Sequence, residues 1–312
     1  MNNREVTEVD DLVARTLRGE PRAVARLISW VEDGARLLPQ ALAALPSRGL
    51  VYVIGLTGSP GVGKSTMTSA LVSAYRARGQ RVGVLAVDPS SPFSGGALLG
   101  DRIRMQDHAT DEGVFIRSMA SRGHLGGMAA STPQAVRVLE AAGCDIVLIE
   151  TVGVGQSEVD VAAAADATVV LLAPGMGDGI QAAKAGILEV ADIVCVNKAD
   201  RDGAESTARE IRQMLRLGAL VEGWTPLVVT SVASKGTIQD LVDALDLRQG
   251  WLGEADHLVA RRRERATAEI LALAQARARE RWKARLDPEV VDGVAEGSVS
   301  PFDAADGLLA GD

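Results

Sequence analysis

Short apolar runs alternate with helix-like segments along most of the chain. A short apolar run bounded by turn residues is typical of a buried strand, whereas apolar residues repeated every three or four positions indicate an amphipathic helix. Strands are predicted at residues 51–56, 81–87, 113–118, 144–150, 167–173, 192–197 and 225–231. Helical patterns are clearest at residues 64–79, 132–142, 179–190, 204–217 and 237–246. This alternation predicts an α/β fold of βαβ units, with a mostly parallel central sheet flanked by helices.

Both ends of the chain are predicted to add helices to this core. In the first fifty residues, Val24, Leu27, Ile28 and Val31 fall on one stripe of a helix. Residues 253–286 are rich in Ala and Arg, which is typical of a solvated helix face. A long helix outside the sheet can also serve as a dimer arm, so both interpretations remain open for this segment.

The composition bears on the classes of function. The chain has 312 residues and a net charge of −8, which argues weakly against nucleic-acid binding because a phosphate backbone favours a basic face. Cys144 and Cys195 lie inside apolar runs, so we expect core residues rather than a disulfide or a metal site. The N-terminus carries no apolar signal segment, and no apolar run is long enough to span a bilayer. We therefore expect a cytoplasmic location and no membrane partner.

A glycine-rich loop follows the first predicted strand and precedes a predicted helix. Its residues 58–65 have the G-x-x-x-x-G-K-S pattern of a phosphate-binding P-loop. Such glycines let the backbone wrap around phosphates, and the N-terminus of the next helix adds its dipole. Lys64 can reach the β- and γ-phosphates, and the Ser65 hydroxyl can ligate Mg²⁺. The predicted nucleotide contacts of this loop are Gly58, Ser59, Pro60, Gly61, Val62, Gly63, Lys64, Ser65 and Thr66.

A second motif indicates which base the loop serves. The strand at 192–197 ends in the N-K-x-D motif Asn197-Lys198-Ala199-Asp200, at the sheet edge where α/β proteins bind ligands. The Asp200 carboxylate can accept hydrogen bonds from N1–H and the 2-amino group of guanine, and adenine offers neither donor. We expect Asn197 to tie this loop to the phosphate loop and Lys198 to lie along the base. Ser231, Val232 and Ala233 fit a third base-contacting loop, so the predicted ligand is GTP.

Three carboxylates lie at or after the ends of predicted strands beside the phosphate loop. Asp88 directly follows the strand at 81–87, Asp101 lies in the following loop, and Glu150 ends the strand at 144–150 and begins the segment Glu-Thr-Val-Gly. Hydrolysis of GTP needs Mg²⁺, an aligned water and groups that sense the γ-phosphate. We predict catalytic roles for Lys64, Asp88, Asp101 and Glu150, and metal-binding roles for Ser65, Asp101 and Glu150. Most GTPases have D-x-x-G where this chain has Glu150, and we expect the longer side chain to hold Mg²⁺ through a water.

A further glycine-dense segment, residues 174–179, lies next to Gln181 and Lys184. It is either an ordinary loop or a mobile segment that responds to the nucleotide state. The sequence pattern by itself leaves these two alternatives open.

The chain resembles the MeaB/ArgK-type GTPases, which are chaperones of methylmalonyl-CoA mutase. The resemblance covers nearly the whole length, and the region 87–129 is its most specific part. It rests on VDPSSPFSGGALLGDRIRM (87–105), FIRSMASRGHLGGMA (115–129), IETVGVGQSE (149–158), APGMGDGIQAAKAGILEVADIVCVNKAD (173–200) and SPFDAADGLL (300–309). It implies a P-loop NTPase fold of the SIMIBI class, with GTP or GDP as ligand and Mg²⁺ as cofactor.

The resemblance also implies an organisation and a role. It divides the chain into an N-terminal helical extension (1–50), a P-loop GTPase domain (51–250) and a C-terminal helical dimerisation extension (251–312). It implies a homodimer that gates the loading of adenosylcobalamin onto the mutase, protects the loaded enzyme and helps to eject damaged cofactor. Switch segments are expected near residues 88–101, 150–157 and 173–184. Gln181 and Lys184, in the third, are expected to couple the nucleotide state to the mutase.

Two other functions fit parts of the pattern. A metal-insertion GTPase of hydrogenase or urease normally carries metal on clustered His and Cys residues, and this sequence has no such cluster. A kinase linked to the transport of lysine, arginine or ornithine would need a pocket for an acceptor group, and the N-K-x-D motif argues against ATP. The predicted function is therefore a GTPase chaperone, with these two as alternatives.

Overall fold

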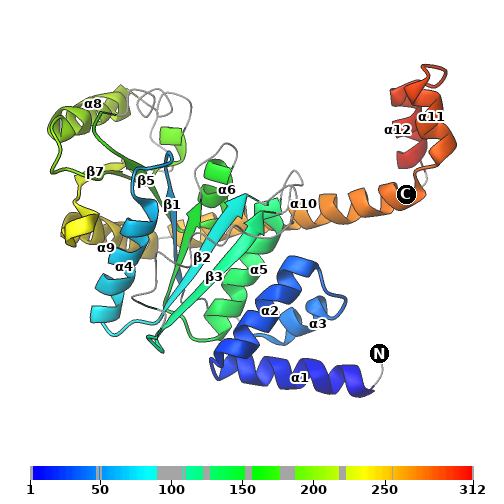
Figure 1. The fold of residues 1–312 in the computed structure, drawn as a ribbon, viewed down its shortest axis with the longest axis horizontal. Helices are drawn as coiled ribbons and strands as arrows, with labels where there is room; N and C mark the ends of the chain where they lie inside the picture. Colours follow the sequence, from blue (N-terminus) through cyan, green and yellow to red (C-terminus); the bar gives the residue numbers. More distant parts are fainter. Residues whose placement is uncertain are drawn as a thin grey trace. The chain divides into compact units, whose positions relative to one another are not determined.

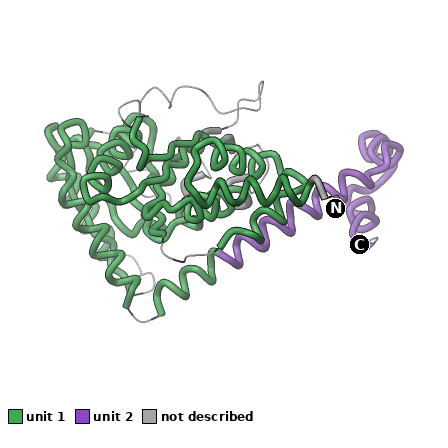
Figure 2. The backbone as a smooth tube through the Cα atoms, turned by 90° about the horizontal axis from the view of Figure 1, so that it is seen from below, with its two compact units in different colours: residues 1–265 green, residues 266–312 purple. Residues whose placement is uncertain are grey.

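A computed structural model describes residues 3–46, 49, 51–89, 108, 110–121, 127–151, 157–175, 187–217, 223–254 and 256–310. The chain divides into two compact units, residues 1–265 and residues 266–312 (Figure 2). The first unit contains the sheet and the phosphate loop, and the second consists of the end of one long helix and two short helices.

Seven parallel strands form the sheet of the first unit, in the order β3-β2-β4-β1-β5-β6-β7 (Figure 1). The strands are β1 (Tyr52–Thr57), β2 (Val82–Pro89), β3 (Val114–Ser121), β4 (Ile146–Thr151), β5 (Ala167–Leu172), β6 (Ile193–Val196) and β7 (Leu227–Thr230). Each predicted strand is present, and the predicted parallel α/β fold is confirmed. The pattern predicts these strands because strands covered on both faces have nearly continuous apolar sequences.

Helices cover both faces of the sheet, as Figure 1 shows. The helices of the described residues are α1 (Asn3–Leu17), α2 (Pro21–Asp33), α3 (Leu38–Ala44), α4 (Lys64–Ala77), α5 (Gly127–Ala141), α6 (Ser157–Ala164), α8 (Ala204–Leu217), α9 (Gln239–Gly253), α10 (His257–Arg285), α11 (Pro288–Ala295) and α12 (Pro301–Leu309), and the last two lie in the second unit. Short 3₁₀ helices, η2 (Ile187–Val190) and η3 (Ala233–Lys235), complete the described elements. Neighbouring strand residues point to opposite faces, so Val53 belongs to the apolar cluster that includes residues of α1, α2, α3, α5 and α6, whereas Ile54 belongs to the cluster that includes residues of α4 and α9.

The observed helices differ from the predicted ones in several places, and one is α9, which continues past the predicted end at residue 246 to Gly253. Helix α5 begins at Gly127, although Pro133 resembles a helix start because proline fits the first turn. Helix α6 has no counterpart among the predictions, since its eight residues are too few to show a clear helical period. Of the helix predicted at 179–190, the structure describes only η2, and residues 179–186 lie outside the described part of the chain.

The N-terminal helices pack onto one face of the first unit. Val24, Leu27, Ile28 and Val31 of α2 are all buried, which confirms the predicted stripe. These side chains join one apolar cluster with residues of α1, α3 and α5. The N-terminal helices therefore form part of the hydrophobic core on the face of the sheet that α5 covers.

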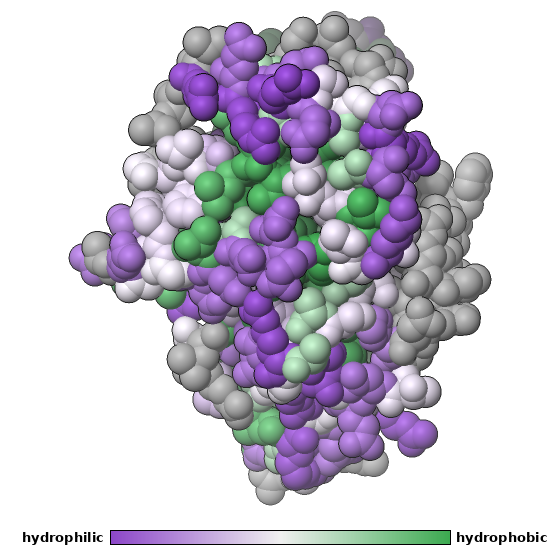
Figure 3. Space-filling view, turned by 90° about the vertical axis from the view of Figure 1, so that its left-hand side faces the viewer, coloured by the Kyte–Doolittle hydropathy of each residue, from purple (hydrophilic) through white to green (hydrophobic). Residues whose placement is uncertain are grey.

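The edge strand β7 is less covered than the central strands. All four residues of β7 are partly exposed, whereas β1, β4, β5 and β6 are buried throughout. Figure 3 shows this side of the molecule, where hydrophobic side chains reach the surface between hydrophilic ones. A strand this short presents few unpaired backbone groups, which limits edge-to-edge association.

A buried ion pair supports the sheet near the starts of β5 and β6. Arg248 of α9 donates to Asp192 at 2.7 Å, and the two side chains are 2% and 10% exposed. The guanidinium lies over the rings of Trp224 and Trp251, at 4.9 and 4.5 Å from their centroids. Asp192 also accepts the backbone N–H of Thr168 at 2.8 Å. Because a buried charge is costly without partners, this cluster fixes α9 against the sheet.

The second unit consists of helices with largely exposed surfaces. None of the described side chains of α10, α11 and α12 is buried within the chain. Asp287 and Ser300 cap the short helices α11 and α12 by accepting backbone N–H groups. Among the helices that the structure describes, none has the length and apolar composition needed to cross a membrane.

The buried pair of Arg248 with Asp192 can be compared with a more exposed pair of the same chemistry, Arg78 with Asp246. We expect Arg248→Ala to lower the free energy of unfolding by about 3–5 kcal/mol, because it leaves a buried carboxylate without its cation. We expect Arg78→Ala, which breaks the half-exposed pair with Asp246, to cost less than about 1 kcal/mol. Urea unfolding followed by circular dichroism measures both. Equal losses in the two variants would show that burial does not set the strength of the Arg248 pair.

Candidate functional site

The phosphate loop joins β1 to α4 at the carboxyl end of the sheet. Gly58 and Gly63 have φ values of 143° and 97°, which side chains rarely adopt. A Cβ atom at Gly58 would lie 2.3 Å from the Leu171 carbonyl oxygen, and one at Gly63 would lie 2.6 Å from Nδ2 of Asn197. Glycine is therefore required at both positions, because the loop runs directly against its neighbours.

The side chains at the start of α4 are held by the loop and by β4. Lys64 is largely buried, and its Nζ donates to the carbonyl oxygens of Gly58 at 2.5 Å and Ser59 at 3.2 Å. The Ser65 hydroxyl donates to Oε1 of Glu150 at 2.6 Å. Glu150 reaches this position because β4 pairs directly with β1, with Leu56 opposite Glu150. The structure thus brings together a lysine, a hydroxyl and a carboxylate that lie up to 86 residues apart.

Asn197 joins three loops through one buried amide. Its Nδ2 donates to the Val62 carbonyl oxygen of the phosphate loop at 2.8 Å. Its Oδ1 accepts the Ser231 hydroxyl at 3.2 Å and the Ala233 N–H at 3.1 Å. Asn197, the first residue of the N-K-x-D segment, therefore contacts both the phosphate loop and the loop 231–233.

Lys198 and Asp200 occupy the outer part of the N-K-x-D loop. Lys198 has a φ of 57°, an uncommon value for a residue with a side chain, and its Nζ donates to the Gly61 carbonyl oxygen at 2.5 Å. Asp200 forms an ion pair with Lys235 at 2.9 Å, and the two side chains are 39% and 64% exposed. The hydrogen bond and the positive charge of Lys235 lower the pKa of the Asp200 carboxyl below its ordinary value.

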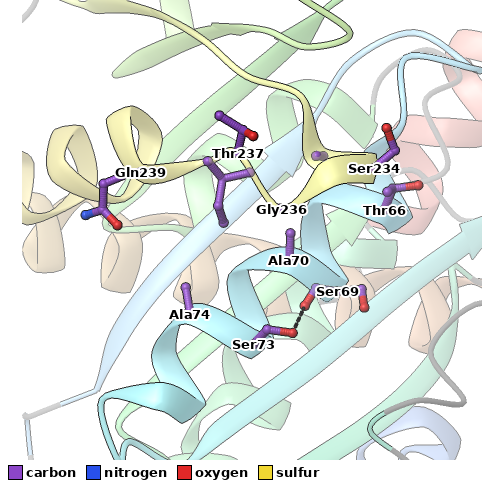
Figure 4. A pocket seen from close by; sticks show the side chains of 11 residues that line it. Thr66, Ser69, Ala70, Ser73, Ala74, Ser234, Gly236, Thr237 and Gln239 are labelled. Atoms are coloured by element: carbon purple, nitrogen blue, oxygen red, sulfur yellow. Dashed lines mark hydrogen bonds between the residues drawn. The ribbon is translucent and has the colours of Figure 1, made fainter.

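A cavity of about 750 Å³ lies between α4 and the turn that follows β7 (Figure 4). It is lined by hydroxyl-bearing and small side chains, together with Ile238 and Gln239. The lining comprises Thr66, Ser69, Ala70, Ser73, Ala74, Ala233, Ser234, Gly236, Thr237, Ile238 and Gln239. Among the described residues, Thr66 and Ala233 belong both to this cavity and to the predicted nucleotide contacts. The cavity therefore adjoins the phosphate loop and the third base loop from one side.

Several predicted site residues are only partly placed. Asp88 is described through its backbone near the end of β2, where the register puts it two positions beyond the one opposite Glu150. Asp101, Gln181 and Lys184 lie outside the described residues. Their roles remain predictions from the sequence.

Two residues beside this site were not among the sequence predictions. Thr68 donates to Oε2 of Glu150 at 2.8 Å, and Lys235 pairs with Asp200. Thr68 lies three residues after Ser65, on the same face of a helix, so helical spacing could have indicated it. Nothing in the sequence distinguishes Lys235 from a solvated lysine.

The cysteines behave as core residues, as predicted. Both are free and buried, and burial raises the pKa of each thiol to about 12. Thiols in this state are poor nucleophiles and poor metal ligands. Within the described ranges, no group of three or more His, Cys, Asp or Glu side chains is placed to hold a metal ion.

Comparison with known proteins gives a family and close relatives. The family described as "Methylmalonyl Co-A mutase-associated GTPase MeaB" matches residues 24–287. A protein of Pyrococcus abyssi named as a GTPase is 43% identical over 311 residues, covering 96% of this chain and 96% of that protein. The "Methylmalonic aciduria type A homolog, mitochondrial" of Mus musculus is 34% identical over 334 residues, covering 99% of this chain and 80% of that protein.

The fold is similar to that of a solved structure over nearly the full length. A crystal structure titled "LAO/AO transport system kinase" superposes with a TM-score of 0.75 at 26% sequence identity. The match covers 99% of this chain and 98% of that chain. The similarity supports the architecture of a parallel sheet flanked by helices.

The ion pair between Lys235 and Asp200 predicts a change in titration. In Lys235→Met, the Asp200 carboxyl should titrate at a higher pH than in the wild type, because the neighbouring positive charge is removed. A carboxyl whose pKa is lowered in the folded protein stabilises the folded state at pH values above its ordinary pKa. This stabilisation is lost as the pH falls through the lowered pKa. Carboxyl ¹³C chemical shifts measure the titration. Lys235→Arg keeps the charge and should preserve the low pKa, and identical titration in all three proteins would contradict the assignment.

Proposed function

Because the chain belongs to the MeaB family of GTPases, we propose that its hydrolysis of GTP serves an adenosylcobalamin-dependent methylmalonyl-CoA mutase. In this proposal, the nucleotide state gates the loading of the cofactor, protects the loaded mutase and helps to eject damaged cofactor. The description of the family, which names the mutase, is the observation that carries this choice of client. The name of the mouse relative, which refers to methylmalonic aciduria, supports the same choice.

The loops joined by Asn197 are the proposed nucleotide site. Residues 58–66 would hold the phosphates through backbone N–H groups and Lys64, whose ammonium already lies over the loop. Asp200 would accept hydrogen bonds from the two donors of guanine through its carboxylate oxygens. Lys198, which reaches Gly61, would lie along the base, with Ser231, Val232 and Ala233 beside it.

The residues beside Lys64 fit a magnesium ion. The Ser65 hydroxyl and the Glu150 carboxylate are 2.6 Å apart, and hard oxygen donors of this kind are the ligands that Mg²⁺ prefers. When bound, the ion would neutralise charge that develops on the phosphates. We propose that Ser65, Glu150 and Asp101 hold it, that Lys64 stabilises the transferred phosphate, and that Asp88 and Asp101 help to orient the attacking water.

The proposed coupling to the mutase runs through segments beside the nucleotide. Residues 88–101, 150–157 and 173–184 would change arrangement with the γ-phosphate, with Gln181 and Lys184 transmitting the change. The segment at 150 begins at Glu150 itself, so one buried carboxylate belongs to both the metal site and a switch. This continuity supports a link between nucleotide state and partner.

We further propose that the chain acts as a homodimer through its C-terminal helices. Large apolar side chains of these helices are exposed, among them Ile270, Leu271, Phe302 and Leu309. Phe302 is 82% exposed, which is costly in water unless a partner covers it. A second copy of the chain could bury such side chains by symmetry.

A kinase linked to amino-acid transport is the second candidate, because the solved structure with a similar fold is titled a transport system kinase. A kinase passes the γ-phosphate to an acceptor group, whereas a GTPase passes it to water. The N-K-x-D loop joined to the phosphate loop favours guanine, and therefore the GTPase, over an ATP-dependent kinase.

Replacing the guanine acceptor should change the preferred nucleotide. We expect Asp200→Asn to weaken GTP binding by roughly 10-fold or more and to favour XTP, because an amide can donate where xanthine carries an acceptor. Asp202→Asn makes the same change of charge two residues away, on an exposed side chain, and should leave the preference for GTP intact. Competition between GTP and XTP, measured by calorimetry, gives the ratio. An unchanged ratio in Asp200→Asn would refute the base assignment.

The client can be tested directly with labelled nucleotides. The protein is mixed with γ-labelled GTP or ATP and with an adenosylcobalamin-dependent methylmalonyl-CoA mutase. We expect release of phosphate from GTP, a complex whose stability differs between GDP and a non-hydrolysable GTP analogue, and a changed hydrolysis rate. Lys64→Ala should release no phosphate, since the transferred group loses its cation.

The same mixture separates the alternatives. Label transferred from ATP to an acceptor would favour the kinase. A mutase that neither binds nor alters hydrolysis would exclude it as the client. Size-exclusion chromatography with light scattering gives the oligomeric state of the protein alone. A monomer at all concentrations would exclude the homodimer.

A further inference from the structure

Thr68 contacts the carboxylate that the proposed magnesium site uses. Its hydroxyl lies 2.8 Å from Oε2 of Glu150, and the Ser65 hydroxyl lies 2.6 Å from Oε1. Thr68 is fully buried and Glu150 is 4% exposed. One carboxylate thus lies between two hydroxyls of the same helix, each bonded to a different oxygen.

The spacing along α4 explains this arrangement. Residues three and four apart lie on one face of a helix, so Thr68 follows Ser65 and Lys64 on the side that faces β4. Thr68 also lies 3.1 Å from the Lys64 carbonyl oxygen, a common contact for a helical threonine. The hydroxyl carries one proton, so the Lys64 carbonyl oxygen and Glu150 compete for it, and the shorter contact, at 2.8 Å, is the one to the charged carboxylate.

The length of the Glu150 side chain matters for the second contact. An aspartate on the same backbone would hold its carboxylate about 1.5 Å closer to β4, the length of one C–C bond. Hydrogen bonds of 2.6 and 2.8 Å to two separate hydroxyls could not both survive such a retreat without movement of the strand or helix. The glutamate and the threonine form a matched pair.

We propose that Thr68 is a positioning residue, which holds Oε2 of Glu150 so that Oε1 faces Ser65 and the metal. This inference rests on the proposed Mg²⁺·GTP site and adds to it a residue of the chain itself. Removal of the Thr68 hydroxyl would free the carboxylate to rotate about its last bond, away from the orientation that suits the ion. Groups that orient metal-binding side chains in this way typically change metal affinity by roughly 10- to 100-fold.

The experiment measures GDP binding by calorimetry across a series of Mg²⁺ concentrations and in EDTA. The variants are Thr68→Val, which keeps the shape and removes the hydroxyl, and Thr68→Ser, which restores the hydroxyl. The matched control is Thr16→Val, because Thr16 is equally buried in α1 and bonds the carbonyl four residues before it, far along the chain from this site. Thermal unfolding without nucleotide and metal reports any purely structural loss.

We expect Thr68→Val to need roughly 10-fold more Mg²⁺ for the same GDP affinity. We expect its GDP affinity in EDTA to be unchanged, and Thr68→Ser and Thr16→Val to match the wild type in both conditions. A Thr68→Val protein with lower melting temperature and wild-type Mg²⁺ dependence would overturn the proposal, since it would show a structural role only. If Thr68→Val does not fold, Thr68→Ala gives the same comparison with a smaller side chain.

A double substitution tests whether Thr68 acts through Glu150. Glu150→Asp by itself should raise the Mg²⁺ concentration needed for GDP binding. Addition of Thr68→Val to Glu150→Asp should then have little further effect, because the contact between Thr68 and the carboxylate is already lost. Independent, additive effects would overturn the proposed coupling. A wild-type protein whose GDP binding ignores Mg²⁺ would instead overturn the metal site of the proposed function, which separates the two failures.

Discussion

The buried amide of Asn197 holds together parts of the chain that are far apart in sequence. It donates to the phosphate loop at Val62 and accepts from the loop at Ser231 and Ala233. An amide supplies both a donor and an acceptor in one rigid plane, so a single side chain can fix two loops to each other. Burial of Asn197 makes these hydrogen bonds costly to break, since their groups would be left without water. The bonds of Asn197, together with the contact of Lys198 with Gly61, fix the phosphate and base loops relative to each other.

The sheet makes the contact possible. Parallel pairing places the carboxyl ends of β1, β4 and β6 at one edge, and the strands are buried on both faces. The helices on either side, α4 and α9 against one face and α5 and α6 against the other, keep these ends in register. Loops after the strands can therefore carry polar chemistry while the strands themselves remain apolar.

Glu150 stands where most GTPases have an aspartate, and neighbouring side chains bind its longer carboxylate. A buried carboxylate with few partners would be strongly destabilising, and Ser65 and Thr68 each provide it with a hydroxyl. The guanine end of the proposed site is different, because Asp200 and Lys235 are both well exposed and solvent weakens their attraction. Chemistry at the phosphate end is thus held in a fixed geometry, while the base end can adjust to its ligand.

Much of this protein was predictable from its sequence. The apolar runs determined the seven strands, and spacing of the G-x-x-x-x-G-K-S and N-K-x-D motifs indicated the loops after β1 and β6. Periodicity was less informative for α6, whose eight residues span little more than two turns, and for the start of α5. Local patterns predict secondary structure well for strands that are buried on both faces, because such strands consist mostly of apolar residues.

Tertiary structure alone decided which side chains meet. The sequence places Thr68 in a helix and Glu150 at a strand end, but their contact depends on β4 pairing beside β1. Likewise, Lys235 and Asp200 are brought together only by the parallel pairing of β6 and β7. Motifs record what a residue can do, because chemistry is local. Which residues act together is set by the packing of strands and helices across long sequence separations, which no single stretch of sequence specifies.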